Sequence, residues 1–234
     1  MGGQALAIVM YDLAGRDDRR FSPACWRVRL TLAHKGLDCT ARPTRFGEIA
    51  TIGDGSYKTV PVIVDGVRTI ADSWAIVEYL EAAWPDRPSV FGGPAGKSYA
   101  RFVQGWSETQ VAPAALRMIV LDLFDHIDPA DRDYFRTSRE KRLGMKLEEV
   151  PGDREAKLPA FRALLEPLRR VITQQPFLGG DAPIYADYVA AGTFAWARAT
   201  SPFRLLAADD PIAAWFGRIK ALHGGLLGRS VGYN

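Results

Sequence analysis

Cysteine and histidine are scarce in this sequence, which contains two cysteines, Cys25 and Cys39, and three histidines among its 234 residues. Two cysteines cannot build a disulfide framework. The histidines lie far apart and have no cysteine pair beside them, which argues against a structural zinc site, so we expect no metal. The first apolar run is not preceded by the basic segment of an export signal. We therefore expect a reducing, cytoplasmic location.

Long apolar runs and a surplus of one charge are also missing. Arg117 and Asp122 interrupt the longest apolar stretch well short of a membrane span, so no membrane helix is predicted. Thirty basic against 27 acidic side chains leave a net charge of +3, and the two signs are mixed along the chain. This pattern does not predict a nucleic-acid partner. Hydrophobic residues make up 47% of the chain, which is ample for one large or two small domains.

Strand and helix signals alternate in the first third of the chain. Ser22 and Pro23 have the residue types of a helix N-cap and first helical position, and Arg27, Arg29 and Lys35 are expected on the outer face of that helix. Asp65-Gly66 is a strong hairpin signal. The predicted elements are a buried strand at residues 5–11, a helix from Pro23 to just before Gly36, a short strand at residues 39–42, a hairpin of strands at residues 60–64 and 67–71, and a helix from Ser73 to about Trp84.

This order of elements is typical of a thioredoxin-like domain, with a small mixed sheet and two helices packed on it. A segment rich in proline and glycine follows, and beyond it strand signals stop. We predict a thioredoxin-like domain at residues 1–86, a linker at residues 87–96 and an all-helical domain at residues 97–234. The helices expected in the second domain cover residues 97–126, 129–149, 158–174, 185–199 and 211–223.

Ser22 is the leading candidate for a catalytic residue. It begins a helix after the first strand, where free backbone N–H groups favour an anion. In thioredoxin-type redox proteins the spacing Ser22-Pro23-Ala24-Cys25 holds Cys-x-x-Cys, whose first cysteine is the nucleophile. A serine in that position cannot exchange disulfides, but its hydroxyl can donate a hydrogen bond to a ligand thiolate and lower the thiol pKa. Cys25 and Cys39 are interpreted as core residues.

Two further pairs of residues could hold an extended peptide. Pro61 lacks an N–H and is expected at the start of a strand, with the backbone N–H and C=O of Val60 facing a ligand. Asp72-Ser73 caps the next helix. The Ser73 hydroxyl and the free N–H groups at that helix start also suit a carboxylate, while Asp72 could pair with an ammonium. Such a ligand resembles the head of an amino acid.

Together these residues resemble the glutathione transferase superfamily across nearly the whole chain. Ser22-Pro23 matches its activating residue, Val60-Pro61 its cis-proline, and Asp72-Ser73 the pair that holds the γ-glutamyl head. In the family's buried N-capping motif, matched here by Asp187, a Ser or Thr usually stands where this chain has Ile184. The motifs that look like the bacterial β-etherase branch and its fungal relatives are Ser22-Pro23-x-x-Trp26-Arg27, Val60-Pro61-Val62-Ile63-Val64-Asp65, Asp72-Ser73-Trp74 and Pro85-Asp86-Arg87-Pro88.

The resemblance implies that glutathione is the co-substrate and that its thiolate attacks a hydrophobic aromatic electrophile, such as a lignin-type β-aryl ether. It further implies that Ser22 stabilises the thiolate and that the chain forms a homodimer. Glutathione-binding residues would be Ser22, Lys58, Val60, Pro61, Asp72 and Ser73. The candidates for the electrophile site, all aromatic, are Phe102, Trp106 and Tyr134.

Two alternatives remain open at this stage. The chain could bind aromatic ligands without turnover, as a transferase-like carrier or scaffold. It could also be a thiol reductase that uses Cys25 as its nucleophile, although the serine at position 22 disfavours that chemistry.

Overall fold

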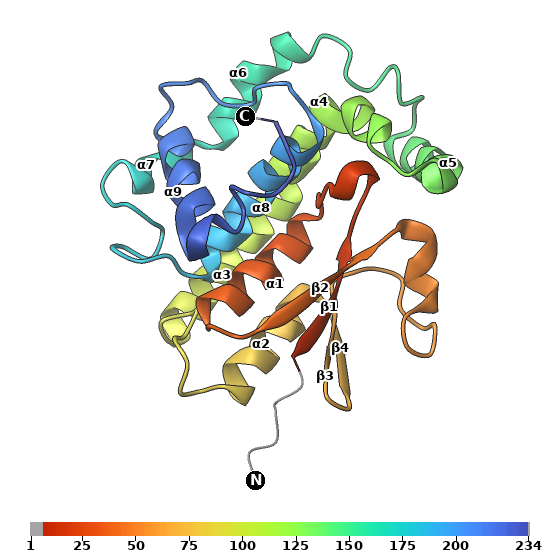
Figure 1. The fold of residues 1–234 in the computed structure, drawn as a ribbon. Coiled ribbons are helices and arrows are strands. Elements are labelled where there is room, and N and C mark those ends of the chain that lie inside the picture. The colour runs from red at the N-terminus through yellow and green to blue at the C-terminus, as the bar shows by residue number, and fades with distance from the viewer. Residues whose placement is uncertain (1–6, 234) are drawn as a thin grey trace.

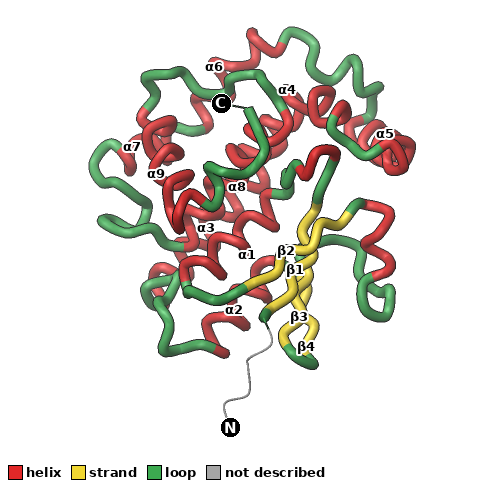
Figure 2. Tube along the Cα trace, viewed as in Figure 1, coloured by secondary structure: helices red, strands yellow, loops and turns green. Residues whose placement is uncertain are grey.

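The computed structural model describes residues 7–233 and contains one four-stranded sheet with helices packed on it (Figures 1 and 2). The strand order is β2-β1-β3-β4, with β1 parallel to β2 and antiparallel to β3, and β3 antiparallel to β4. On the central strands β1 and β3, Met10 lies opposite Ile63, and both are fully buried. The strands are β1 (Ile8–Leu13), β2 (Cys39–Thr44), β3 (Val62–Asp65) and β4 (Arg68–Ala71).

The helices form most of the rest of the molecule. Among those of the second half, α8 and α9 lie on the side of α1 away from the sheet, whereas α5 lies near the segment that follows β2 (Figure 1). Helix α8 packs along α1, and α3 packs along α8. The helices are α1 (Pro23–His34), α2 (Ser73–Ala83), α3 (Pro94–Trp106), α4 (Ala112–Asp125), α5 (Arg132–Leu143), α6 (Arg154–Leu164), α7 (Glu166–Ile172), α8 (Tyr185–Thr200) and α9 (Pro211–Gly225). None of those in the described part of the chain is long and apolar enough to cross a membrane.

The thioredoxin-like arrangement predicted for the first third is confirmed, with shifts at the element ends. Residues 5 and 6 of the predicted first strand lie outside the described residues. Strand β2 continues to Thr44 through Pro43, which it can do because it lies at the sheet edge, where a missing N–H costs no ladder bond. The predicted strand 60–64 begins instead at Val62, and Val67, predicted in a strand, lies in the hairpin turn because Asp65 pairs with Arg68.

The helical second half is confirmed as a class, but its segmentation differs from the prediction. Helix α3 begins at Pro94, inside the predicted linker, and a π-helical turn (Ser107–Val111) joins it to α4. The predicted helix 129–149 ends at Leu143, because Gly144 adopts a left-handed φ of 73°. The predicted helix 158–174 starts earlier, at Arg154, and is divided into α6 and α7.

Asp187 organises the start of α8 from inside the core. Its carboxylate is fully buried and accepts hydrogen bonds from the N–H groups of Leu178 (2.8 Å) and Ile184 (3.0 Å) and from Trp215 Nε1 (2.9 Å). Ile184 is the N-cap residue and has no side-chain acceptor. Asp187 therefore joins α8 to the preceding loop and to α9 without the serine or threonine that the family usually has.

Candidate functional site

Ser22 is the N-cap residue of α1. Its Oγ accepts a hydrogen bond from the backbone N–H of Cys25 at 3.2 Å, and the residue is 7% exposed. The next residue, Pro23, packs closely on α8. A Cβ at Gly192 would lie 3.0 Å from the Pro23 carbonyl oxygen, so glycine permits this approach. The contact with α8 thus fixes the position of the helix start.

The two cysteines lie in surroundings that suppress thiolate formation. Cys25 is fully buried, and burial together with the nearby Asp12 carboxylate raises its pKa well above the usual value. Cys39 is half-buried, and burial raises its pKa to about 11. Neither sulfur therefore has the electropositive, accessible environment of a reactive cysteine.

Val60 presents a backbone donor and acceptor beside the sheet. The Val60–Pro61 peptide bond is cis, and both residues are buried. Within residues 7–233, no group pairs with the Val60 N–H or C=O. Buried backbone groups are seldom left unpaired, so this pair is suited to an extended ligand. Lys58 is exposed two residues earlier.

Asp72 caps α2 with one of its two carboxylate oxygens. Oδ1 accepts from the N–H groups of Trp74 and Ala75, both at 3.0 Å. Asp72 has a φ of 72°, an uncommon conformation for a non-glycine residue that is often found at ligand sites. Its side chain is exposed, and Ser73 beside it is 5% exposed. A ligand can therefore reach a charged cap and a helix N-terminus at one point.

Three residues near this cap were not identified from the sequence: Arg27, Glu108 and Tyr185. Arg27 was expected on the outer face of α1, but it is 3% exposed and its Nη1 lies 2.6 Å from Glu108 Oε1 in the π-helical turn. Lys35, also expected outside, is buried and paired with Glu81 at 2.9 Å. Both basic residues were misplaced because their carboxylate partners lie far away in the sequence.

The Tyr185 hydroxyl is buried and has no hydrogen-bond partner among the described residues. Burial raises the Tyr185 pKa to about 12, while Arg27, Ser73 and Asp72 lie close enough to influence it. The ring of Trp74 lies 5.7 Å from that of Tyr185. The start of α2 thus contacts the second domain through a neutral phenol that is able to donate a hydrogen bond.

The three aromatic candidates for the electrophile site lie in different environments. Tyr134 is 58% exposed, and its ring is 5.8 Å from Phe46, which lies 6.2 Å from Phe21, the residue before Ser22. The rings of Tyr134, Phe46 and Phe21 therefore form a continuous series that ends at the start of α1. Trp106 is half-buried at the end of α3, and Phe102 on α3 is 73% exposed.

No group of three or more His, Cys, Asp or Glu side chains in residues 7–233 is arranged to hold a metal ion. The described groups around α1, α2 and Val60 are a hydroxyl, two helix N-termini and a free backbone pair, which together suit a small peptide with charged ends.

A thioredoxin-like domain followed by a helical domain is the architecture of a class of glutathione-dependent proteins. The Ser22 hydroxyl, the N-termini of α1 and α2 and the free Val60 backbone groups are consistent with that class. A family model described as the glutathione S-transferase N-terminal domain matches residues 18–88, and one described as the C-terminal domain matches residues 99–230. The chain belongs to the glutathione S-transferase family.

Proteins with similar sequences or folds include some from plants and fungi. The rice protein named "Probable glutathione S-transferase GSTU6" (Oryza sativa subsp. japonica) is 28% identical over 217 residues, covering 86% of this chain and 81% of its own. The fold is similar to that of glutathione transferase GSTFuA3 from Phanerochaete chrysosporium, with a TM-score of 0.83, 24% identity, and coverage of 93% and 98% of the two chains. A glutathione S-transferase of Ceriporiopsis subvermispora, crystallised with glutathione, has a TM-score of 0.79 and 26% identity, with coverage of 92% and 96%.

Proposed function

We propose that this protein is a glutathione transferase that joins the glutathione thiolate to a hydrophobic aromatic electrophile. The observation that carries the proposal is the position of Ser22. Its hydroxyl accepts from the Cys25 N–H, which leaves the hydroxyl proton free to donate to a sulfur at the start of α1. The fungal relative crystallised with glutathione supports the same co-substrate.

The Ser22 hydroxyl and the N-terminus of α1 would stabilise the thiolate relative to the thiol. Lowering a thiol pKa by two units is about 3 kcal/mol, within the reach of a helix start and one hydrogen bond. The thiolate then attacks an electrophilic carbon, forming a carbon–sulfur bond as the bond to the leaving group breaks. The leaving group departs with the bonding electrons, and in an aryl ether it leaves as a phenolate.

We assign the remaining glutathione contacts by their chemistry. The free N–H and C=O of Val60, next to Pro61, can form backbone hydrogen bonds with the cysteinyl residue of glutathione, like those between two neighbouring strands. The Asp72 carboxylate suits the γ-glutamyl ammonium, and Ser73 at the helix start suits its carboxylate. Lys58 is exposed two residues before Val60, and its ammonium suits a carboxylate or carbonyl at the other end of the tripeptide.

For the electrophile site, Tyr134 has the strongest support among the three candidates, because its ring continues the aromatic series that ends beside Ser22. Trp106 and Phe102 would contribute from α3. An aromatic acceptor, including a β-aryl ether, fits such a wall because stacked rings add to the free energy gained from buried area.

An assay of the purified protein with three substrates tests the proposal: a β-aryl-ether ketone, chlorodinitrobenzene and a glutathionyl mixed disulfide. We expect conjugation of at least one of the two electrophiles and no reduction of the disulfide, because Cys25 is buried. Tyr134→Ala should raise KM for the electrophile and leave KM for glutathione unchanged. Binding of glutathione without any turnover would favour the carrier alternative.

A further inference from the structure

The loop that connects β1 to Ser22 closes on itself, because Ala14 and Arg20 pair as an antiparallel bridge. At its tip, Asp17 and Asp18 have left-handed φ values of 57° and 55°. This conformation costs free energy in residues other than glycine, and it persists only where surrounding groups fix the backbone. The contacts that fix this loop therefore bear on the position of Ser22.

Arg20 is held through both its side chain and its backbone, two residues before Ser22. Its Nη1 donates to Asp12 Oδ2 on β1 at 2.8 Å, and its Nε donates to Asp18 Oδ1 at 2.7 Å. Its carbonyl oxygen accepts a hydrogen bond from Trp26 Nε1 on α1 at 2.8 Å. Asp12, Arg20 and Trp26 are each 7% exposed or less, so water competes little for these bonds.

Arg29 connects the two partners of Arg20 to each other. Its guanidinium lies over the Trp26 side chain, 4.5 Å from the ring centre, and its Nη1 donates to Asp12 Oδ2 at 3.3 Å. Asp12, Arg20, Trp26 and Arg29 therefore form a closed cycle of contacts, which we call the Asp12 network. It joins β1, the loop before Ser22 and α1, so the loop cannot move without breaking one of these contacts.

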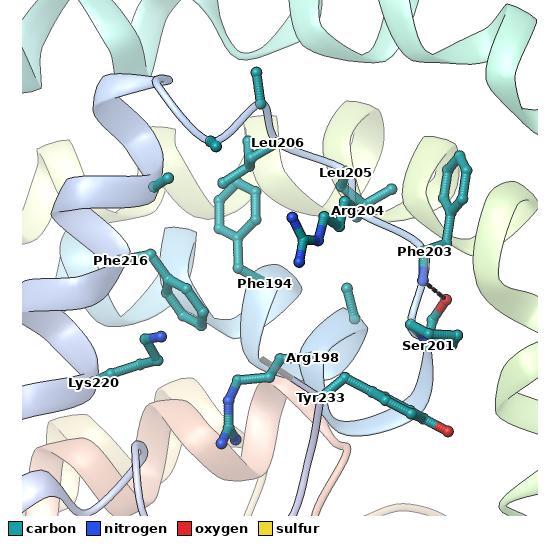
Figure 3. A pocket seen from close by; sticks show the side chains of 15 residues that line it. Phe194, Arg198, Ser201, Phe203, Arg204, Leu205, Leu206, Phe216, Lys220 and Tyr233 are labelled. Carbon is teal, nitrogen blue, oxygen red and sulfur yellow. Dashed lines mark hydrogen bonds between the residues drawn. The ribbon is translucent and has the colours of Figure 1, made fainter.

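The neighbouring Arg19 attaches the same loop to the helical domain. Its Nη1 donates to the Ala199 carbonyl near the end of α8 at 2.7 Å, and its guanidinium lies 4.8 Å from the centre of the Tyr233 ring. Tyr233 also lines the cavity between α8, the loop at residues 201–208 and α9 that is drawn in Figure 3. Successive arginines thus attach the loop before Ser22 to the helical domain and to the sheet.

The Asp12 carboxylate is a costly group to bury. Its Oδ2 accepts from both Arg20 and Arg29, while Oδ1 has no hydrogen-bond partner among residues 7–233. Burial raises the pKa of Asp12 above its ordinary value, although the two arginines act to lower it. Buried ion pairs often stabilise a fold no more than apolar residues of the same volume would. Stability alone does not account for this group, and the feature that it fixes is the segment before Ser22.

We propose that Asp12, Arg20 and Trp26 are positioning residues for Ser22. The network holds the preceding loop in the conformation in which Ser22 Oγ accepts from the Cys25 N–H at 3.2 Å and keeps its own proton for the glutathione sulfur. This inference rests on the function proposed above for Ser22. The three residues act through the serine and not by contact with glutathione, so they should affect the thiol pKa and turnover more than affinity.

Three variants open the network at different points. Asp12→Asn removes the shared charge, Arg20→Gln removes the cation, and Trp26→Phe removes the indole N–H while keeping an aromatic ring. Arg20→Lys is the conservative variant, because it restores a cation opposite Asp12. Lys35→Met is the matched control, because it removes a buried ion pair, of 2.9 Å to Glu81, at the other end of the same helix.

The first measurement is hydrogen exchange of the Cys25 amide, followed by NMR without glutathione, because this N–H donates to Ser22 Oγ. We expect exchange about tenfold faster in the three network variants than in the wild type, with Arg20→Lys and Lys35→Met close to the wild type. Amides at the centre of α8 report global unfolding and should exchange more slowly than Cys25 in every protein. Unchanged Cys25 exchange in the three variants would overturn the proposal.

The second measurement combines the thiolate absorbance of bound glutathione against pH with steady-state kinetics. The network variants should raise the thiol pKa and lower kcat about fivefold, with KM for glutathione nearly unchanged. Lys35→Met should lower Tm and change neither the thiol pKa nor kcat. A fall in kcat without a change in the thiol pKa would overturn the proposal, because general destabilisation has that effect.

Each network substitution is also made in the Ser22→Ala protein. There it should change the thiol pKa and kcat no further, because the hydroxyl that it positions is absent. Additive losses in that background would overturn the proposal. If Ser22→Ala alone changes neither quantity, the function proposed for Ser22 fails, whereas exchange of the Cys25 amide still decides whether the network positions its hydroxyl.

Discussion

The Ser22 hydroxyl and the Cys25 backbone share one hydrogen bond, of 3.2 Å, in which Ser22 Oγ is the acceptor. The bond caps α1 and orients the hydroxyl, while the Cys25 side chain points into the core and is fully buried. The two residues that stand where a redox protein has its cysteine pair therefore have separate roles. In the proposed reaction Ser22 offers its proton to the glutathione sulfur, whereas Cys25 fills space in the core.

Ser22→Ala should raise the pKa of the bound glutathione thiol, because the thiolate loses a hydrogen bond that the neutral thiol makes less well. Turnover at neutral pH should fall by about ten- to a hundredfold, or about 1.4–2.8 kcal/mol. The loss should shrink as the pH rises above the new pKa, where the thiolate forms without help. Thiolate absorbance against pH and kcat against pH check this, and a loss of rate that is constant across pH would contradict it.

Cys25→Ala should leave turnover near the wild-type value and cost stability only. The substitution removes one buried sulfur, so we expect the free energy of unfolding to fall by about 1–2 kcal/mol. Burial and Asp12 raise the Cys25 pKa, so alkylating reagents should not modify this thiol before the protein unfolds. Urea unfolding and mass spectrometry after alkylation provide the measurements. Activity that is lost here but kept in Ser22→Ala would instead identify a cysteine nucleophile.

Asp72→Asn separates the capping role of this residue from a role in binding. Asparagine keeps the oxygen that accepts from Trp74 and Ala75 and tolerates a positive φ, but it has no charge. If the carboxylate pairs with the γ-glutamyl ammonium, calorimetry should show affinity for glutathione weakened by about 1.5–3 kcal/mol, with little change in stability. Glutathione lacking its α-amino group is the matched ligand, and it should bind both proteins alike. Equal glutathione affinity in the two proteins would leave Asp72 as a cap alone.

Local signals in the sequence were sufficient for the thioredoxin-like order of elements and for the two helix caps. Ser22, Asp72 and the Asp65-Gly66 turn act on neighbours a few residues away, so their types determine their surroundings. The caps are confirmed, but the glutathione contacts remain predictions for all six residues: Ser22, Lys58, Val60, Pro61, Asp72 and Ser73.

Local sequence signals could not predict contacts between residues that lie far apart in the sequence. Arg27 is buried because Glu108 meets it from the π-helical turn, 81 positions later in the chain. The end of α5 at Gly144 and the division between α6 and α7 also differ from the helical periodicity. Hydrophobic periodicity indicates which residues form the apolar face of a helix. It does not indicate at which residue the helix ends and a loop begins.

Phe102 provides a test of the proposed homodimer. This side chain is 73% exposed on α3, and two-fold interfaces bury apolar residues of this kind. We expect light scattering to give twice the chain mass of 25.8 kDa for the wild type and the mass of one chain for Phe102→Glu. Phe102→Leu keeps the apolar contact and should remain dimeric. A wild-type mass of one chain at micromolar concentration would contradict the dimer.

Ile184→Thr should supply the helix cap that α8 lacks. Ile184 has the extended backbone of an N-cap residue, with φ of −122° and ψ of 177°, but its side chain has no acceptor for the N–H groups of the first turn. Valine has nearly the shape of threonine, so Ile184→Val is the control for the lost methyl contacts. We expect the threonine variant to be more stable than the valine variant by about 1 kcal/mol, or about 2–4 °C in Tm. Equal stability would mean that the buried Asp187 carboxylate, which binds the Ile184 N–H at 3.0 Å, already orders the helix start fully without a side-chain cap.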